Sequence, residues 1–324
     1  MSISNLRIVF MGTPEFAVAS LAGLIKAGFN VVGIVTAPDK PSGRGQKIHE
    51  TDVKRFANTH PEINLLQPEK LKDQVFIDDL RSLDADLFVV VAFRMLPEVV
   101  WSMPAKGTIN LHASLLPQYR GAAPINWAII NGETKTGVTT FFIEKEIDTG
   151  KVIFVEEVSI DEKDNAGTLH DKLMNTGAEL LVKTVGAIAS GIFEPKDQLG
   201  KQQNQDLKMA PKIFKETCII QWDNELDIVY NFIRGLSPYP SAWTTFVFDD
   251  SAQRFTAKVF DVEKELCNHQ NAPGAIVTDD KKYLKIAVKN GYIHIKSLQI
   301  EGKKRLGVED FLRGFKNCGD FRVE

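Results

Sequence analysis

The sequence contains few cysteines and no long apolar stretch. Its three cysteines, Cys218, Cys267 and Cys318, lie far apart and form no Cys-x-x-Cys pair, which argues against a zinc knuckle or a disulfide framework. The six histidines contain no His-Glu-x-x-His motif, so we expect no metal site. The longest apolar run, residues 87–93, is far shorter than the roughly 20 residues that cross a bilayer.

The chain also lacks an excess of positive charge. It has 39 Lys and Arg against 42 Asp and Glu, which excludes a polycation that coats nucleic acid. Residues 196–324 hold 20 cations against 18 anions, a weak tilt in the direction that a domain touching RNA would need. Residues 1–7 show no signal-peptide pattern, so we expect a cytoplasmic protein that does not contact membranes. We also expect a monomer.

The start of the chain predicts an α/β fold. Residues 6–11 and 31–35 read as strands that flank a helix, and this βαβ pattern predicts a mostly parallel, Rossmann-like sheet. The turn after the first strand lacks Gly-x-Gly-x-x-Gly, so the NAD fingerprint is missing. Further along, residues 69–83 are predicted to be helical and residues 86–92 to form a buried strand.

The length of 324 residues suggests about two domains, at roughly 150 residues each. We assign residues 1–193 to the first domain, 194–208 to a polar linker without periodicity, and 209–324 to a second domain. The second domain shows five or so short strands, with Asn290-Gly291 as a strong hairpin signal. This pattern predicts a small closed β-barrel. Such barrels often bind oligonucleotides, but the fold alone does not establish this function.

The polar residues of greatest chemical interest follow a short apolar strand over residues 108–112. Alternation along the strand places Asn110 and His112 on the same side. Proline and glycine residues between 113 and 124 then force an irregular loop before a helix. Open α/β sheets bind ligands at such strand ends. A single histidine on a strand is nevertheless more often structural. The pattern alone therefore leaves open whether Asn110 and His112 are catalytic or structural.

Two motifs resemble those of a known family. Asn110-x-His112-x-Ser114-Leu115-Leu116-Pro117-x-Tyr119-Arg120-Gly121 resembles the signature of the folate-dependent formyltransferases, and Ile147-Asp148-Thr149-Gly150 is similar to the family's second motif. The resemblance runs nearly end to end, and it implies an OB-like barrel as the second domain. It also implies a catalytic trio of Asn110, His112 and Asp148, and a folate site that includes Ser114, Leu115, Leu116 and Pro117.

The chemistry of these side chains suits formyl transfer to an amine. The Asn110 amide can donate to a developing oxyanion, and His112 can carry a proton at neutral pH. Asp148 can bond the other ring nitrogen and hold one tautomer, although an aspartate before Gly150 is equally typical of a turn. No good nucleophile is present among them, which favours direct transfer over a covalent intermediate.

Residues 37–47 contain prolines, glycines and three cations, and we expect an exposed loop. Composition alone favours a solvated surface loop. The family members that act on tRNA carry a similar Pro-Asp-x-Pro-x-Gly-Arg-Gly-x-Lys loop that enters the acceptor stem, so the resemblance implies tRNA contacts for Lys40, Arg44 and Lys47. Relatives often carry glycine where Arg94 stands, in a loop expected to border the pterin pocket, and its effect there stays open.

The resemblance implies transfer of a formyl group from 10-formyltetrahydrofolate to the amino group of initiator methionyl-tRNA. One alternative is a folate-dependent formyltransferase or hydrolase that acts on a non-tRNA acceptor such as a sugar nucleotide. A different class is a non-catalytic tRNA-binding protein on an inactive transferase scaffold. The loop with Arg44 and the second domain argue against the first alternative, and the complete catalytic trio argues against the second.

Overall fold

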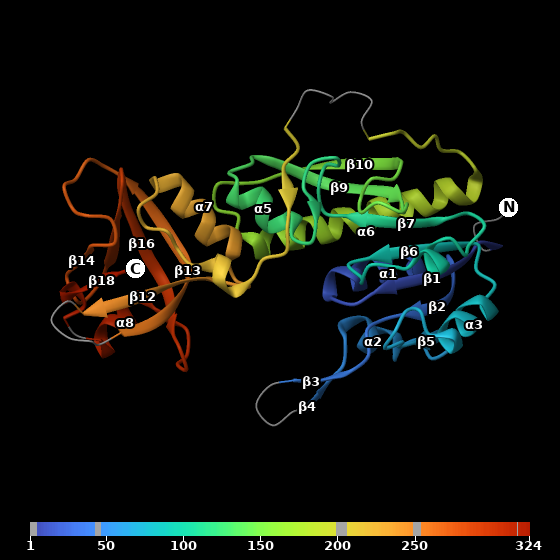
Figure 1. Ribbon diagram of the computed structural model, residues 1–324, viewed down its shortest axis with the longest axis horizontal. Helices are drawn as coiled ribbons and strands as arrows, with labels where there is room; N and C mark the ends of the chain where they lie inside the picture. The colour runs from blue at the N-terminus through green and yellow to red at the C-terminus, as the bar shows by residue number, and fades with distance from the viewer. Residues whose placement is uncertain (1–4, 43–46, 199–205, 249–253, 316) are drawn as a thin grey trace. The chain divides into compact units, whose positions relative to one another are not determined.

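The computed structural model describes residues 5–42, 47–198, 206–248, 254–315 and 317–324. The chain divides into two compact units, and each unit is assembled from more than one stretch of sequence (Figure 1). The first unit comprises residues 1–121, 136–159 and 170–208, and the second comprises residues 122–135, 160–169 and 209–324.

The first unit is built on a seven-stranded sheet with the order β10-β9-β7-β6-β1-β2-β5 (Figure 1). The strands are β1 (Arg7–Gly12), β2 (Asn30–Val35), β5 (Asn64–Leu66), β6 (Leu87–Val91), β7 (Thr108–His112), β9 (Lys135–Phe142) and β10 (Val152–Ser159). The five strands from β7 to β5 pair in parallel, and β9 runs antiparallel to β7. The predicted mostly parallel, Rossmann-like sheet is confirmed.

Helices cover both faces of this sheet. They are α1 (Glu15–Lys26), α2 (Asp52–Ala57), α3 (Gln74–Ser82), α4 (Glu98–Trp101) and α6 (Ala166–Ser190). A Cβ atom at Gly177 would lie 2.9 Å from the Leu111 side chain, so this glycine allows α6 to pack closely against β7. The opposite face carries an apolar cluster in which Val90 of β6 packs with Leu80 of α3 and with Leu96. None of the helices within the described ranges is long and apolar enough to cross a membrane.

The predicted loop over residues 37–47 contains short strands. β3 (Lys40–Ser42) and β4 (Lys47–His49) pair in an antiparallel ribbon, with Lys40 opposite His49. No strand signal was recognisable here, because each strand has only three residues and β3 contains Pro41. The first unit also contains β8 (Arg120–Gly121).

The second unit is a nearly closed antiparallel barrel with the order β14-β15-β16-β13-β12-β18, and β17 pairs with β16. The strands of the barrel are β12 (Ala242–Phe248), β13 (Arg254–Leu266), β14 (Ile276–Thr278), β15 (Leu284–Val288), β16 (Gly291–Ile300), β17 (Leu306–Gly307) and β18 (Phe321–Val323). The unit also contains β11 (Met209–Ala210), which is not part of the barrel. The amide of Val323 donates to the Gly274 carbonyl over 2.9 Å, which joins the two ends of the sheet. The predicted barrel and the hairpin at Asn290-Gly291 are confirmed.

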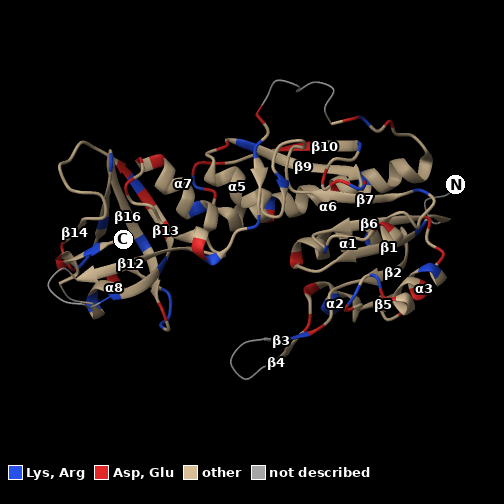
Figure 2. Ribbon diagram, in the orientation of Figure 1, with Lys and Arg blue, Asp and Glu red and all other residues tan. Residues whose placement is uncertain are grey.

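Three α-helices and two short 3-10 helices complete this unit: α5 (Pro124–Ile130), α7 (Leu226–Leu236), α8 (Val308–Gly314), η2 (Lys215–Cys218) and η3 (Cys318–Asp320). Both signs of charge are interspersed along β13, whereas β16 carries a single cation, Lys296 (Figure 2). Two anions of β13 are paired with cations of neighbouring strands: Glu265 with Lys285 of β15 at 2.6 Å, and Glu263 with Lys296 of β16 at 2.8 Å. β13 therefore does not present a surface of one sign.

Candidate functional site

The candidate site begins at the carboxyl end of β7. Asn110 pairs in register with Val90 of β6, and His112 pairs with Thr139 of β9, so both side chains lie on the face that carries α3. His112 is buried, with 7% of its surface exposed. Asn110 is half-buried, and its amide makes no hydrogen bond to any residue within the described ranges. The strand therefore brings an available donor and a titratable ring to the same edge of the sheet.

The His112 ring lies between two groups from different loops. Its Nε2 atom is 2.9 Å from the carbonyl oxygen of Tyr119. Because a carbonyl oxygen only accepts hydrogen bonds, Nε2 carries the hydrogen and donates it. The Nδ1 atom is 3.9 Å from the Oδ2 atom of Asp148, which is too long for a hydrogen bond but close enough to attract a protonated ring. The tautomer is therefore set by the Tyr119 carbonyl, which sequence reasoning missed, and the expected hydrogen bond from the His112 ring to the Asp148 carboxylate is not formed.

The two residues that flank the ring have unusual backbone conformations. Tyr119 has a φ of 59° and Asp148 a φ of 55°, in the left-handed region that residues other than glycine seldom adopt. The Asp148 carboxylate accepts a hydrogen bond of 3.0 Å from the amide of Gly121. This bond joins the two strained turns on either side of His112. Such outliers cluster at functional sites when the surroundings hold them in place.

The loop after β7 is stabilised by its own hydrogen bonds. The Ser114 hydroxyl donates to the Gln118 carbonyl over 2.6 Å, and the Thr139 hydroxyl donates to the Ser114 carbonyl over 2.6 Å. Ser114 and Pro117 are buried, whereas Leu115 and Leu116 are partly exposed. Because the Ser114 hydroxyl is used inside the loop, the surface available to a ligand consists of main chain and the two leucines.

The backbone around position 150 leaves no room for a side chain, which explains why the second motif has a glycine there. A Cβ atom at this position would lie 1.8 Å from the carbonyl oxygen of Phe142, a distance that no side chain can occupy. The loop from 143 to 151 therefore approaches the end of β9 as closely as the backbone allows. This close approach fixes where Asp148 can sit relative to β7 and β9.

Gln198 is a site residue that sequence reasoning missed. Its Nε2 atom donates to the carbonyls of Asp148 and Gly150 over 2.9 Å and 2.7 Å, and its Oε1 atom accepts from Arg120 Nη2 over 2.6 Å. The sequence placed Gln198 in the polar linker over residues 194–208. A single glutamine in a stretch without periodicity offers no pattern from which these contacts could have been inferred.

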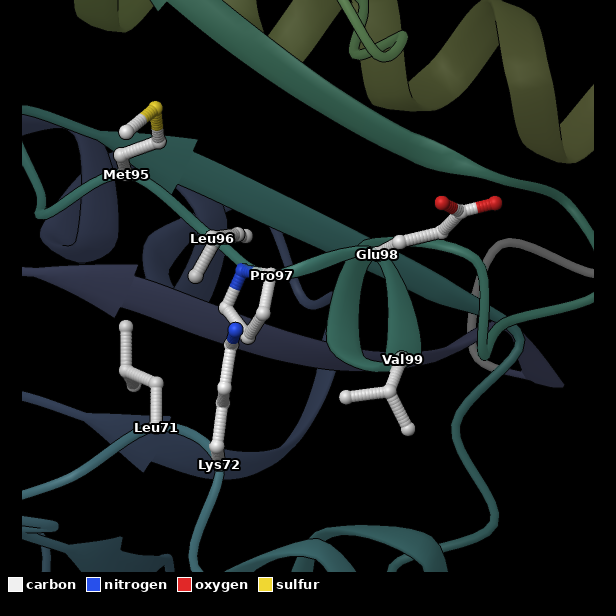
Figure 3. Close-up of a pocket in the computed structure, with 7 residues that line it drawn as sticks. All are labelled: Leu71, Lys72, Met95, Leu96, Pro97, Glu98 and Val99. Atoms are coloured by element: carbon white, nitrogen blue, oxygen red, sulfur yellow. The ribbon is translucent and has the colours of Figure 1, made fainter.

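A cavity of about 520 Å³ lies on the face of the sheet that carries α3 and α4 (Figure 3). It is lined by Leu71, Lys72, Met95, Leu96, Pro97, Glu98 and Val99. Arg94 is not among these residues. Its guanidinium donates to the carbonyls of Pro68 and Glu69 over 2.8 Å and 2.9 Å, and burial lowers its pKa. Arg94 therefore joins the loop after β6 to the segment before α3.

Of the three residues predicted to contact tRNA, the structure describes Lys40 and the backbone of Lys47. Lys40 is exposed on β3, the backbone of Lys47 lies opposite Ser42 on β4, and Arg44 lies outside the described residues. At the base of this ribbon, Lys54 Nζ lies 2.5 Å from an Asp39 carboxylate oxygen. The hydrogen bond from Lys54 lowers the pKa of the Asp39 carboxyl, and the same contact raises the pKa of Lys54.

Across the described ranges, no group of three or more His, Cys, Asp or Glu residues is arranged to hold a metal ion.

The sheet, the barrel and the polar groups around His112 define the class of protein. The family model described as "Formyl transferase" matches residues 6–185, and the model described as "Formyl transferase, C-terminal domain" matches residues 212–316. The first match alone covers more than half of the chain. The chain therefore belongs to the formyl transferase family.

The most similar relatives narrow this class. The methionyl-tRNA formyltransferase of Bacteroides fragilis is 53% identical over 324 residues, which cover 100% of this chain and 99% of that protein. The methionyl-tRNA formyltransferase of Flavobacterium johnsoniae is 51% identical over 321 residues, which cover 99% of this chain and 100% of that protein. Among solved structures, HypX from Aquifex aeolicus in complex with tetrahydrofolic acid has a TM-score of 0.61 at 18% identity, over 95% of this chain and 47% of that one. The sugar 3N-formyltransferase WlaRD has a TM-score of 0.61 at 17% identity, over 92% of this chain and 99% of that one.

Proposed function

We propose that this protein transfers a formyl group from 10-formyltetrahydrofolate to the amino group of initiator methionyl-tRNA. Its full-length relatives are named methionyl-tRNA formyltransferases, which supports methionyl-tRNA as the acceptor. The observation that carries the proposal is the arrangement at the end of β7. There the Asn110 amide, which has no hydrogen-bond partner among the described residues, lies on the same strand face as a buried His112 whose ring lies 3.9 Å from the Asp148 carboxylate.

Each of these groups has a distinct chemical role. The Asn110 amide donates to the formyl oxygen as negative charge develops on it. His112 donates through Nε2 to Tyr119, so Nδ1 is the ring nitrogen that takes up the proton from the attacking amine. The Asp148 carboxylate then stabilises the resulting imidazolium across 3.9 Å. None of the three acts as a nucleophile in this scheme.

The folate donor supplies the formyl group that is transferred. As the bond between the formyl carbon and N10 of the folate breaks, His112 returns its proton to N10, which releases tetrahydrofolate. The place of the folate in the first unit is inferred from the loop after β7, where Leu115 and Leu116 offer apolar surface and the main chain offers polar groups. The cavity lined by Met95, Leu96 and Pro97 adds apolar surface on the face of the sheet that also carries Asn110. This surface fits a flat, mostly apolar ring that hydrogen-bonds along its edges.

The choice of acceptor separates this proposal from the alternative of a sugar nucleotide. The sugar-formylating neighbour shares the fold at 17% identity, whereas relatives that match at 53% identity along the whole chain are named for methionyl-tRNA. We infer that Lys40, Arg44 and Lys47 contact the acceptor RNA, because three cations close in sequence can meet one stretch of phosphate backbone.

The direct test is to incubate the purified protein with 10-formyltetrahydrofolate and methionine-charged initiator tRNA. N-formylmethionine should be recovered after the ester bond to the tRNA is hydrolysed. A parallel reaction with an amino-sugar nucleotide should give little product. Faster formylation of the sugar nucleotide would favour the alternative acceptor, and absence of transfer to either acceptor would overturn the proposal.

A further inference from the structure

We propose that Gln198 is a positioning residue that holds Asp148 in place beside His112. The inference rests on the proposed function, since it concerns the geometry of that reaction. It starts from a conflict in the local structure. Asp148 has a φ of 55°, in the left-handed region, which aspartate tolerates better than most residues but which is still less favourable than the right-handed one, so contacts that hold this turn contribute to its geometry.

The side-chain amide of Gln198 provides that contact. Its Nε2 group donates to the Asp148 carbonyl over 2.9 Å and to the Gly150 carbonyl over 2.7 Å. Both hydrogens of the amide are thus used on carbonyls two residues apart. This double donation fixes the turn that presents the Asp148 side chain.

The other end of the amide connects this turn to the loop after β7. Gln198 Oε1 accepts from Arg120 Nε over 3.2 Å and from Arg120 Nη2 over 2.6 Å. The next residue, Gly121, donates its amide to the Asp148 carboxylate over 3.0 Å. Gln198 and this carboxylate therefore join the same two turns at separate points, and His112 lies between the turns.

Two substitutions separate loss of the donor group of the Gln198 amide from loss of both its donor and its acceptor. Gln198→Glu retains an oxygen that can accept from Arg120. It also places a second oxygen, which lacks a hydrogen, against the carbonyls of Asp148 and Gly150, so the donation to the catalytic turn is lost. Gln198→Met keeps the length of the side chain and removes both functions.

Gln299→Met is a matched control in the second unit. The Gln299 side chain also donates its Nε2 hydrogen to a main-chain carbonyl, that of Lys303, over 2.7 Å. This contact does not involve Asp148 or Gly150. The control therefore removes an amide of the same kind while leaving the hydrogen bonds to the catalytic turn in place.

The experiment measures kcat and KM for both substrates with the full-length chain. We expect Gln198→Glu and Gln198→Met to lower kcat between about 10- and 100-fold, the usual loss when a catalytic group is misplaced, with KM changed less than about twofold. Gln299→Met should keep kcat within about twofold. A Gln198→Glu enzyme with wild-type kcat would overturn the inference, because Arg120 contact alone would then suffice.

Two further readouts distinguish failure of this inference from failure of the proposed function. Hydrogen exchange of the Gly121 amide, which bonds the Asp148 carboxylate, should become faster in Gln198→Glu and stay unchanged in Gln299→Met, whatever the substrate proves to be. Unchanged exchange in both variants would overturn the role of Gln198. In the formylation assay, Gln198→Glu combined with Asp148→Asn should lose no more rate than Asp148→Asn alone, since Gln198 acts through Asp148. Additive losses would show that Gln198 acts elsewhere.

Discussion

The loops around His112 and the β3–β4 ribbon are fixed in different ways. The loop after β7 is held by buried side chains that bond main-chain atoms, such as the Thr139 hydroxyl that donates to the Ser114 carbonyl. The described part of the ribbon is anchored at its base by charged and amide side chains, with Asp39 bound by Lys54 and Gln67. Loss of a buried hydrogen bond is costly, whereas a partly exposed ion pair contributes little to stability. The first arrangement suits a loop that positions reacting groups, and the second is compatible with the tRNA contacts that we propose for the ribbon.

The largest effect should follow from removal of the imidazole. His112→Ala should lower kcat at least about 10²-fold, the usual contribution of a positioned acid–base group, and leave folate binding intact. His60→Ala is a matched control, because His60 contacts Thr59 and Phe56 near the end of α2 and is not part of the site. Near-normal turnover of His112→Ala in a steady-state assay would remove this residue from the mechanism.

A smaller loss should follow when the second loop is displaced without any change to a reacting group. Gly150→Ala places a Cβ atom 1.8 Å from the Phe142 carbonyl in the present geometry, so the turn that carries Asp148 has to shift. We expect kcat to fall about 10-fold or more, together with a lower Tm. Gly186→Ala in α6 is the control, since the nearest atom would be 3.9 Å away and alanine favours helices. Equal Tm values and rates for the two variants would show that the loop tolerates displacement.

The sequence predicted the parts of this comparison that depend on periodic patterns. The parallel sheet, the shared face of Asn110 and His112, and the hairpin at Asn290-Gly291 all follow from alternation or turn chemistry. The helix predicted over residues 69–83 was too long. α3 begins at Gln74 because the Asp73 side chain accepts from the Val75 amide over 2.9 Å and caps the helix there.

Other features depend on contacts between distant residues and leave no local pattern. Gln198 reaches carbonyls 50 and 48 residues earlier in the chain. The barrel is completed by β18, whose Val323 amide bonds the Gly274 carbonyl 49 positions away. A polar residue in a stretch without periodicity, or a strand of three residues, becomes recognisable only when its partner is known.

A still smaller and more selective effect is expected in the ribbon. Arg44→Ala should weaken binding of methionyl-tRNA and reduce the slope of log affinity against log salt by about one, as for one lost phosphate contact. Folate binding should not change. Arg55→Ala is the control, because Arg55 is an exposed cation of α2 that pairs with Asp52.

The comparison between acceptors decides how the Arg44 result is interpreted. Formylation of a small methionine ester should be unaffected by Arg44→Ala if the residue serves tRNA alone. Equal slowing of the ester and the full tRNA would show that the segment supports the chemistry or the fold. The tRNA-contacting role would then be wrong.

The smallest effect concerns the base of the ribbon, where Lys54 binds Asp39. The pKa of Asp39 is lowered from 3.8, so its contribution to stability is present above pH 3.8 and is lost as the pH falls through the lowered value. The pKa of Lys54 is raised from 10.5, so its contribution is present below pH 10.5 and is lost as the pH rises through the raised value.

The Tm difference between wild type and Lys54→Met should therefore be constant from about pH 5 to about pH 9 and shrink on both sides. Arg81→Met, which removes an exposed pair with Asp78 at 2.9 Å, should change Tm little at any pH. A Tm difference for Lys54→Met that is larger at pH 3 than at pH 7 would show that packing of the lysine stem, and not its ion pair with Asp39, fixes the base of the ribbon.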